Sequence, residues 1–148
     1  MRNFKNPLNV SNKKLTSKLP PQAIDFEEAV LGAIMVDANA MAEIGDILSS
    51  NVFYKEAHQE IFKVLEFLFS EGKPIDMMLV SQQLEKNKTL KKCGGFAYLA
   101  ELTNKVISSA NIEYHARIIV QKHIQRELIS TCSSIIQDAL DPSRHLLY

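Results

Sequence analysis

Apolar positions along the chain recur at helical spacing, and the clearest run lies at residues 58–69. Six positions there follow the i, i+3, i+4, i+7, i+10, i+11 pattern of one helix face: His58, Ile61, Phe62, Leu65, Leu68 and Phe69. Gly72 comes next, as the left-handed residue that often follows the end of a helix. We expect this helix to form the centre of the core.

Further helices are predicted from their start signals. Asp25 opens an Asp-x-x-Glu sequence that resembles a capping box, and Asp76 is placed to cap another helix. Gly94-Gly95 precedes a further apolar run. The helices are predicted at residues 25–35, 40–48, 76–85 and from 95 onward. Because no stretch alternates apolar and polar residues convincingly, we predict an all-α fold with a compact helical head over residues 20–107.

A longer helix is predicted at residues 111–140, which contain neither proline nor glycine. Asn111 stands at its start as a capping residue, and Asp141-Pro142 ends it. At roughly 1.5 Å per residue such a helix would be about 45 Å long, which is more than a small domain can cover. We therefore expect this helix to need a partner surface.

The second half of this long helix carries an apolar stripe. Its residues are spaced by four, four, three and four positions: Ile124, Leu128, Cys132, Ile135 and Ala139. Ile129, Ile136 and Leu140 widen the stripe. Burying one isoleucine side chain is worth roughly 1.5–3 kcal/mol, so a monomer that exposes several of them would forgo several kcal/mol. We expect self-association through this stripe.

Charges balance over the whole chain, with 17 basic and 17 acidic residues, but their distribution is uneven. Residues 1–18 carry five basic and no acidic side chains, whereas residues 25–76 carry eleven acidic and three basic ones. We predict that residues 1–19 form a disordered basic arm. This arm could contact phosphate groups, or it could act only as a solubilising tail.

The sequence does not contain the residue patterns that carry catalysis or hold a cofactor. Its five glycines never form Gly-x-x-x-x-Gly-Lys-Ser/Thr, which excludes an ordinary P-loop ATPase. His115 and His123 lie too far apart on a helix to share a metal ion. We interpret the many carboxylates, Glu27 and Glu28 among them, as solvated, and His58 as a hydrogen-bonded core residue. We predict no catalytic residue, cofactor or metal in this chain.

Targeting and membrane signals are also missing from the sequence. Nothing resembles a signal peptide, and no apolar run reaches the roughly 20 residues that a membrane span requires. Cys93 and Cys132 form no motif. We expect a cytoplasmic chain with reduced thiols, in which Cys132 lies in the core or in an interface.

A series of short motifs covers about residues 20–140. They are PPQAIDFEEAVLGAIM, NVFY followed by His58 and Ile61-Phe62, GKPID, GGFAYLAEL, Ala110-Asn111 and Arg126-x-Leu-Ile. Their order and spacing resemble the N-terminal domain of DnaB-type replicative DNA helicases. Each motif alone would be weak, and the resemblance rests on the whole set.

The resemblance implies a helical head followed by a helical hairpin, so we assign residues 108–148 to the first arm and the start of the second, near Ser143. In that family, hairpins of neighbouring subunits pair, and six domains form a collar as a trimer of dimers. The collar binds the helicase-binding domain of primase during DNA replication. The ATPase motor, which uses ATP and Mg, lies C-terminal to this region and is absent from the chain.

The partners implied are therefore a second copy of the chain, primase, and DNA only through the parent assembly. Candidate partner-binding residues are apolar or aromatic positions that we expect on the surface of the hairpin or at its junction with the head: Tyr98, Leu128, Ile129, Cys132, Ile135 and Ile136. Among them, Tyr98, Ile129 and Ile135 are predicted to meet primase. The competing interpretation of each residue is ordinary core or hairpin packing.

Other functions stay open at this point. An unrelated helical module could bind DNA through the basic arm, with an affinity that weakens steeply with salt. A small enzyme could use the helix start at Gly94-Gly95 to hold an anionic substrate, but it would need an acid or base nearby. The chain could also be a natural stand-alone paralogue, although we favour a piece of a longer helicase.

Overall fold

The computed structural model describes residues 18–106 and 108–143. Every regular element in these residues is a helix, which confirms the all-α prediction. The elements are α2 (Ile24–Val36), α3 (Ala40–Ile44), the 3-10 helix η2 (Ser50–Val52), α4 (Glu56–Ser70), α5 (Met77–Lys86), α6 (Gly95–Asn104) and α7 (Ile112–Leu140). The predicted basic arm lies almost entirely outside the described residues, as do residues 144–148 of the predicted second hairpin arm.

The centre of the head is α2. Residues 30–35 are all buried, so this helix is enclosed on nearly every side, and it contacts α3, α4, α6 and α7. A Cβ atom at Gly32 would lie 2.2 Å from the carbonyl oxygen of Leu102, so only glycine permits this approach of α6. The predicted central helix, α4, buries one face in the core but keeps a polar face, whereas α2 has an almost unbroken apolar run and is the more enclosed of the two.

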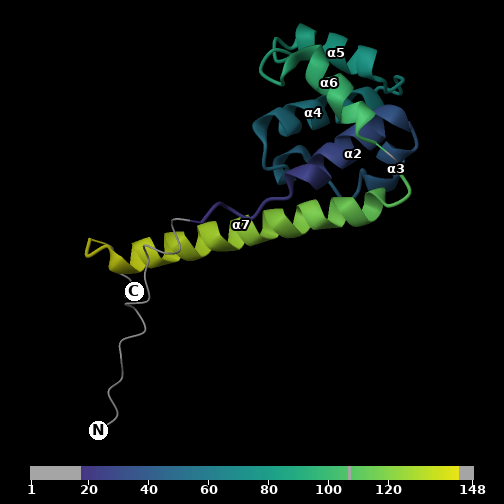
Figure 1. Cartoon of the computed structure of the whole chain (residues 1–148). Helices are drawn as coiled ribbons and strands as arrows, with labels where there is room; N and C mark the ends of the chain where they lie inside the picture. The colour runs from purple at the N-terminus through teal and green to yellow at the C-terminus, as the bar shows by residue number, and fades with distance from the viewer. Residues whose placement is uncertain (1–17, 107, 144–148) are drawn as a thin grey trace.

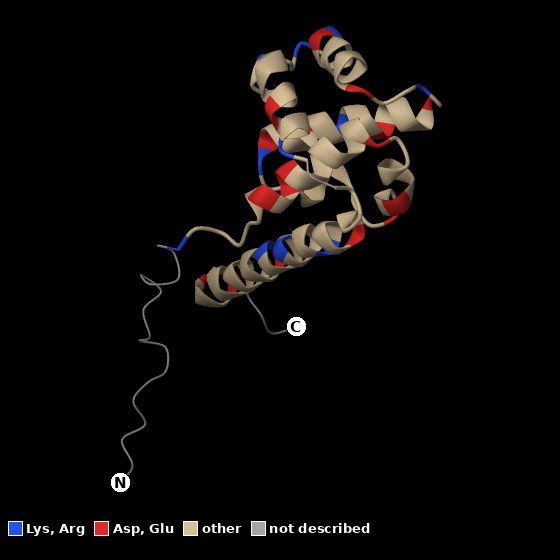
Figure 2. Ribbon diagram, turned by 45° about the vertical axis from the view of Figure 1, so that its right-hand side comes forward, with Lys and Arg blue, Asp and Glu red and all other residues tan. Residues whose placement is uncertain are grey.

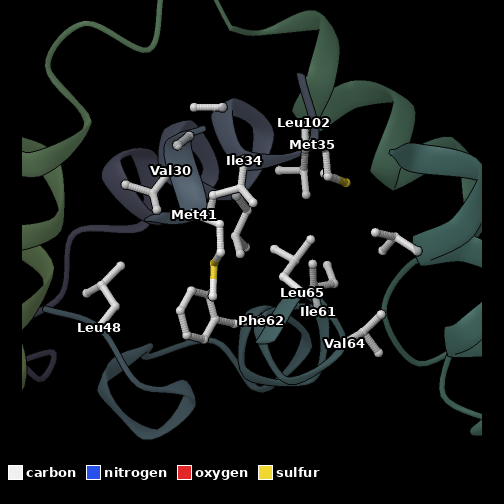
Figure 3. Close-up of a cluster of buried hydrophobic side chains, with 14 of the residues drawn as sticks. Val30, Ile34, Met35, Met41, Leu48, Ile61, Phe62, Val64, Leu65 and Leu102 are labelled. Carbon is white, nitrogen blue, oxygen red and sulfur yellow. The ribbon is translucent and has the colours of Figure 1, made fainter. Parts of the chain in front are cut away.

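One face of α4 packs against α2 and completes the core (Figure 3). Ile61, Phe62 and Leu65 on this face are fully buried and lie toward Ile34 and Met41. Phe69, the last residue of the predicted apolar face, is instead exposed near the end of the helix. The core therefore forms where α2 and α4 meet, with α3 closing one side.

Two of the predicted helix ends are confirmed. Gly72 has φ +63°, and the N–H of Lys73 donates to the carbonyl of Leu68 at 2.9 Å, as expected after a helix. The Asp76 carboxylate accepts the Leu79 N–H at 2.9 Å and caps α5.

Other predicted caps do not form. No side chain caps α2, because the helix begins at Ile24 with Ala23 at the N-cap position, so that Asp25 lies inside the first turn. Glu28, the expected second member of the capping box, bonds to Tyr98 and Lys105. Asn111 does precede α7, but its side chain makes no capping bond. The second predicted helix also ends early, at Ile44, and the chain continues in turns to Leu48.

The longest helix, α7, lies along one side of the head and continues beyond it (Figure 1). Its first turns bury Ile112, Ala116 and Ile119 in the contact with α2 and α3. No later residue of α7 is buried. The core thus extends into α7, past residue 107, where we had predicted the head to end.

Candidate interaction surface

The C-terminal half of α7 presents apolar side chains to solvent. Leu128 is 60% exposed and Leu140 is 73% exposed. Seven exposed residues make up what we call the distal α7 surface: Ile124, Leu128, Ile129, Cys132, Ile135, Ile136 and Leu140. Apolar groups gathered in this way on a surface commonly mark an interaction site.

Five of the six predicted partner-binding residues belong to the distal α7 surface. They are Leu128, Ile129, Cys132, Ile135 and Ile136. The helical spacing of the stripe was the signal that identified them as a group. Ile124 and Leu140, which the predicted apolar stripe already included, are exposed at its two ends, so the surface extends along nearly five turns of the helix.

Arg126 ties α7 to the head where the helix leaves it. Its guanidinium donates to the carbonyl oxygens of Pro21 at 2.8 Å and of Val52 at 2.7 Å. The same group lies 5.4 Å from the centre of the Tyr54 ring. Arg126 thereby connects α7 both to the residues before α2 and to the end of η2. These contacts anchor the helix to the head just before its distal half begins.

A buried pair of Glu27 and His58 lies inside the head, away from the distal α7 surface. Glu27 is 1% exposed, and its carboxylate accepts the Nδ1–H of His58 at 2.6 Å and the backbone N–H of Tyr54 at 2.6 Å. The prediction of a hydrogen-bonded core histidine is confirmed. The prediction that Glu27 is solvated was wrong, because its carboxylate holds the start of α4 against α2.

Tyr98 belongs to the hydrogen-bond network around Glu27 and His58 and not to the distal α7 surface. Its hydroxyl lies 2.7 Å from His58 Nε2 and 3.2 Å from Glu28 Oε1, and it accepts the ammonium of Lys55 at 3.1 Å. The side chain is therefore only partly exposed and points inward. We had predicted an exposed side chain, whereas α2 and α4 supply polar partners for the Tyr98 hydroxyl and leave it partly buried. Its role in partner binding stays a prediction.

The electrostatics of the network follow from burial and from Lys105. Desolvation and the neighbouring Glu28 carboxylate raise the pKa of Tyr98, so its hydroxyl stays protonated. Burial alone would raise the pKa of Glu28, but the hydrogen bond and charge of Lys105 outweigh it and lower that pKa. Lys105 also pairs with Glu101 at 2.9 Å. These groups bind α2, α4 and α6 together.

The network has no geometry for catalysis. His58 is 0% exposed, so a substrate cannot reach its ring, and both ring nitrogens are already engaged. Beside Gly94-Gly95, burial raises the pKa of the Cys93 thiol, which makes it less reactive.

Within the described residues, no three His, Cys, Asp or Glu side chains gather as metal ligands. In the same part of the chain, no helix combines the length and apolar character of a membrane span.

Comparisons of the sequence and of the fold with known proteins all lead to one family. Residues 19–121 match the family model described as the DnaB-like helicase N-terminal domain. The chain belongs to this family. It is 41% identical over 123 residues to the replicative DNA helicase DnaB of Geobacillus stearothermophilus, covering 83% of this chain and 27% of that protein. It is 40% identical over 124 residues to the replicative DNA helicase DnaC of Bacillus subtilis, covering 84% and 27%.

Solved structures show the same DnaB N-terminal fold. The N-terminal domain of DnaB helicase from Mycobacterium tuberculosis superimposes with a TM-score of 0.80 at 30% identity, covering 82% of this chain and 86% of that one. A structure of a DnaB-like replicative helicase and its interactions with primase matches with a TM-score of 0.69 at 26% identity, covering 78% and 27%. The chain thus spans about a quarter of the length of the curated relatives it matches.

Proposed function

We propose that this DnaB N-terminal domain is the assembly and docking module of a replicative DNA helicase. In this proposal the domains pair through α7, six of them form a collar as a trimer of dimers, and the collar receives the helicase-binding domain of primase. The unwinding of DNA, with ATP and Mg, belongs to a motor domain of the parent protein. The whole assembly works in the cytoplasm.

The observation that carries the proposal is the distal α7 surface. Fully burying a leucine or isoleucine side chain is worth roughly 1.5–3 kcal/mol, and the large apolar residues here are about half exposed. Covering the surface in a partner therefore offers several kcal/mol. Because α7 is anchored to the head by Arg126, pairing would order little additional chain, which keeps the entropic cost of association low.

Primase docking is supported by family membership. One solved relative is a DnaB-like replicative helicase described with its interactions with primase. Ile129 and Ile135 remain our candidates for that contact in this chain, because both side chains belong to the distal α7 surface and are 55% and 60% exposed. Tyr98 stays a prediction, but it is partly buried and lies apart from the distal α7 surface, so the proposal does not depend on it.

The test is light scattering on a size-exclusion column, with the chain alone and mixed with the helicase-binding domain of its cognate primase. We expect a dimer or larger assembly that shifts to a heavier complex. Ile129→Asn should weaken assembly or primase binding at least tenfold, because it places an amide on an apolar contact. Ser130→Asn is the matched control, since Ser130 is exposed on the opposite side of the helix.

A strict monomer that ignores primase would contradict the proposal. Equal behaviour of Ile129→Asn and the Ser130→Asn control would show that the distal α7 surface is not the contact. Far-UV circular dichroism of both variants checks that the head remains folded.

A further inference from the structure

The connection between α5 and α6 carries a concentration of positive charge. Residues 86–92, which we call the basic loop, contain no acidic residue and four lysines: Lys86, Lys88, Lys91 and Lys92. The basic loop lies at the end of the head away from α7, where blue segments gather at the top of Figure 2. This charge contrasts with residues 25–76, which hold α2, α3 and α4 and carry eleven acidic but only three basic side chains.

Three of the four lysines have no carboxylate partner in the part of the chain that the structure describes. Lys92 pairs with Glu56 at the start of α4, and its hydrogen bond lowers the pKa of that carboxyl. Lys86, Lys88 and Lys91 are exposed and form no such pair. Ammonium groups held near one another repel, so the loop gains when a bound anion neutralises them.

Lys88 occupies a backbone position that suits glycine. Its φ is +60°, and no other residue of the described chain except glycine has a positive φ. The hydrogen bonds that end α5 require this conformation. The Lys88 N–H donates to the Glu85 carbonyl at 2.9 Å, and the next N–H, of Thr89, donates to the Leu84 carbonyl at 2.9 Å. A lysine is strained here and a glycine would not be, which points to a use for the lysine side chain.

The core holds the backbone of the basic loop in place. Leu84 and Cys93, which flank the loop, are both buried. The Cys93 N–H donates to the Thr89 carbonyl at 3.0 Å, and the Gly95 N–H donates to the Leu90 carbonyl at 2.9 Å. The lysines therefore project from a fixed backbone, and a ligand would have only their side chains to order.

A shallow pocket and an aromatic side chain adjoin these lysines. The pocket has a volume of about 220 Å³ and is lined by Glu85, Lys88, Leu90 and Lys91. Its charged side chains are all exposed, so it does not enclose a small anion. Phe96 lies in the first turn of α6, directly after the loop, and is 43% exposed. Lysines spread over a surface beside an exposed ring are typical of sites that hold a nucleic-acid strand.

We propose that the basic loop and Phe96 bind single-stranded DNA, with the unpaired lysines at its phosphates and the Phe96 ring against a base. An extended polyanion fits charges that are spread, unpaired and carried on a fixed backbone. The choice of DNA rests on the proposed function, in which the parent protein unwinds DNA and so produces single strands. The contact itself goes beyond that function, which assigns unwinding to a motor domain. An acidic polypeptide would match the charge but has no bases to stack on the ring.

Fluorescence anisotropy of a labelled oligo(dT) of about 20 nucleotides measures binding to the whole chain over a series of salt concentrations. On a plot of log K against log salt, each phosphate contact contributes about 0.7 to the slope, which is about fivefold in affinity at about 0.1 M salt. Lys88→Gly should therefore weaken binding about fivefold and make the slope shallower by about 0.7. It should not lower Tm, because glycine suits a φ of +60°.

Two further variants complete the measurement. Lys73→Gly is the matched control, because it removes an exposed lysine from the connection before α5, and that helix, about 15 Å long, lies between the two sites. It should change oligo(dT) binding by less than about twofold. Phe96→Ala should weaken binding at least about fivefold and leave the salt slope unchanged, because stacking of a base involves no phosphate.

Two results would overturn the inference. Equal salt slopes for Lys88→Gly and Lys73→Gly would place any DNA contact elsewhere, such as at the basic residues 1–18, which every variant retains. Binding of poly-L-glutamate as tight as that of oligo(dT), with neither affected by Phe96→Ala, would identify the partner as an acidic polypeptide.

Light scattering on the same variants separates this inference from the proposed function. The basic loop lies away from the distal α7 surface, so Lys88→Gly should assemble like the wild-type chain. If this variant lost assembly together with oligo(dT) binding, the loop would act through assembly and the direct contact would be refuted. A monomeric wild-type chain that ignores primase but binds oligo(dT) with the expected changes would refute the proposed function and support the contact.

Discussion

Removing the Glu27 carboxylate should destabilise the head more than any change of an exposed charge. Glu27 accepts hydrogen bonds from His58 Nδ1 and from the Tyr54 N–H, each at 2.6 Å, and lies 3.5 Å from the Lys55 N–H. The site is 1% exposed, so water cannot replace the lost acceptor. In Glu27→Ala these donors would remain buried without a partner.

The expected magnitude follows from these contacts. A buried donor left without an acceptor costs about 1–3 kcal/mol, and Glu27→Ala would leave two close donors, His58 Nδ1 and the Tyr54 N–H, so that their costs add. We expect Glu27→Ala to lower the free energy of unfolding by about 3–5 kcal/mol. At roughly 2–4 °C per kcal/mol for a chain of this size, Tm should fall by about 6–20 °C. Glu27→Gln keeps one acceptor oxygen and should cost about half as much.

Urea denaturation followed by far-UV circular dichroism measures the difference. All variants are compared at one protein concentration, because self-association would contribute to the apparent stability. Glu113→Ala is the control, since Glu113 pairs only with Arg117 on the exposed side of α7, which is worth less than about 1 kcal/mol. If Glu27→Ala came within about 1 kcal/mol of this control, the carboxylate would not hold α4 against α2.

Two further predictions concern backbone approach and pH. Gly32→Ala should unfold the head or lower its Tm by more than about 10 °C, because the Cβ of the new alanine would meet the Leu102 carbonyl. Gly45→Ala is the control and should be tolerated with at most a small loss of Tm. Thermal denaturation of the two variants measures the difference. The pKa of Glu28 is lowered in the fold, so its contact with Lys105 stabilises the head above the ordinary carboxyl pKa and loses this effect as pH falls; Glu28→Gln should flatten the acid side of the stability profile.

Helix periodicity predicted most of the fold because the head is built from amphipathic helices that bury one face. It predicted α2 as a helix but not its central place, because residues 30–35 are buried together and no polar face marks the direction of the core. It also misplaced Glu27, whose partner His58 is 31 residues away in sequence. One local signal was present: Glu27 precedes Val30 by three positions and Leu31 by four, which places it on the apolar side of α2.

The candidate surface was predictable to a different extent. The stripe from Ile124 to Leu140 follows from spacing, and its exposure follows from the length of α7 relative to the head. Tyr98 could not be placed by spacing, since its hydroxyl partners come from α2 and α4. The anchor at Arg126 was equally hidden, because its acceptors are the backbone carbonyls of Pro21 and Val52, which carry no sequence signature.

The head and the distal α7 surface share one continuous helix, and this links folding of the domain to its association. Ile112 and Ile119 belong to the core, while Leu128 and Ile136 belong to the exposed surface, and Arg126 stands between them. In the proposed function, a partner that covers this surface would bind only when α7 is helical and anchored. Such association would stabilise the core by mass action, and a change that loosens the Arg126 anchor would weaken both the core and the association. For this reason, such a change should lower both the thermal stability of the head and the tendency of the chain to associate.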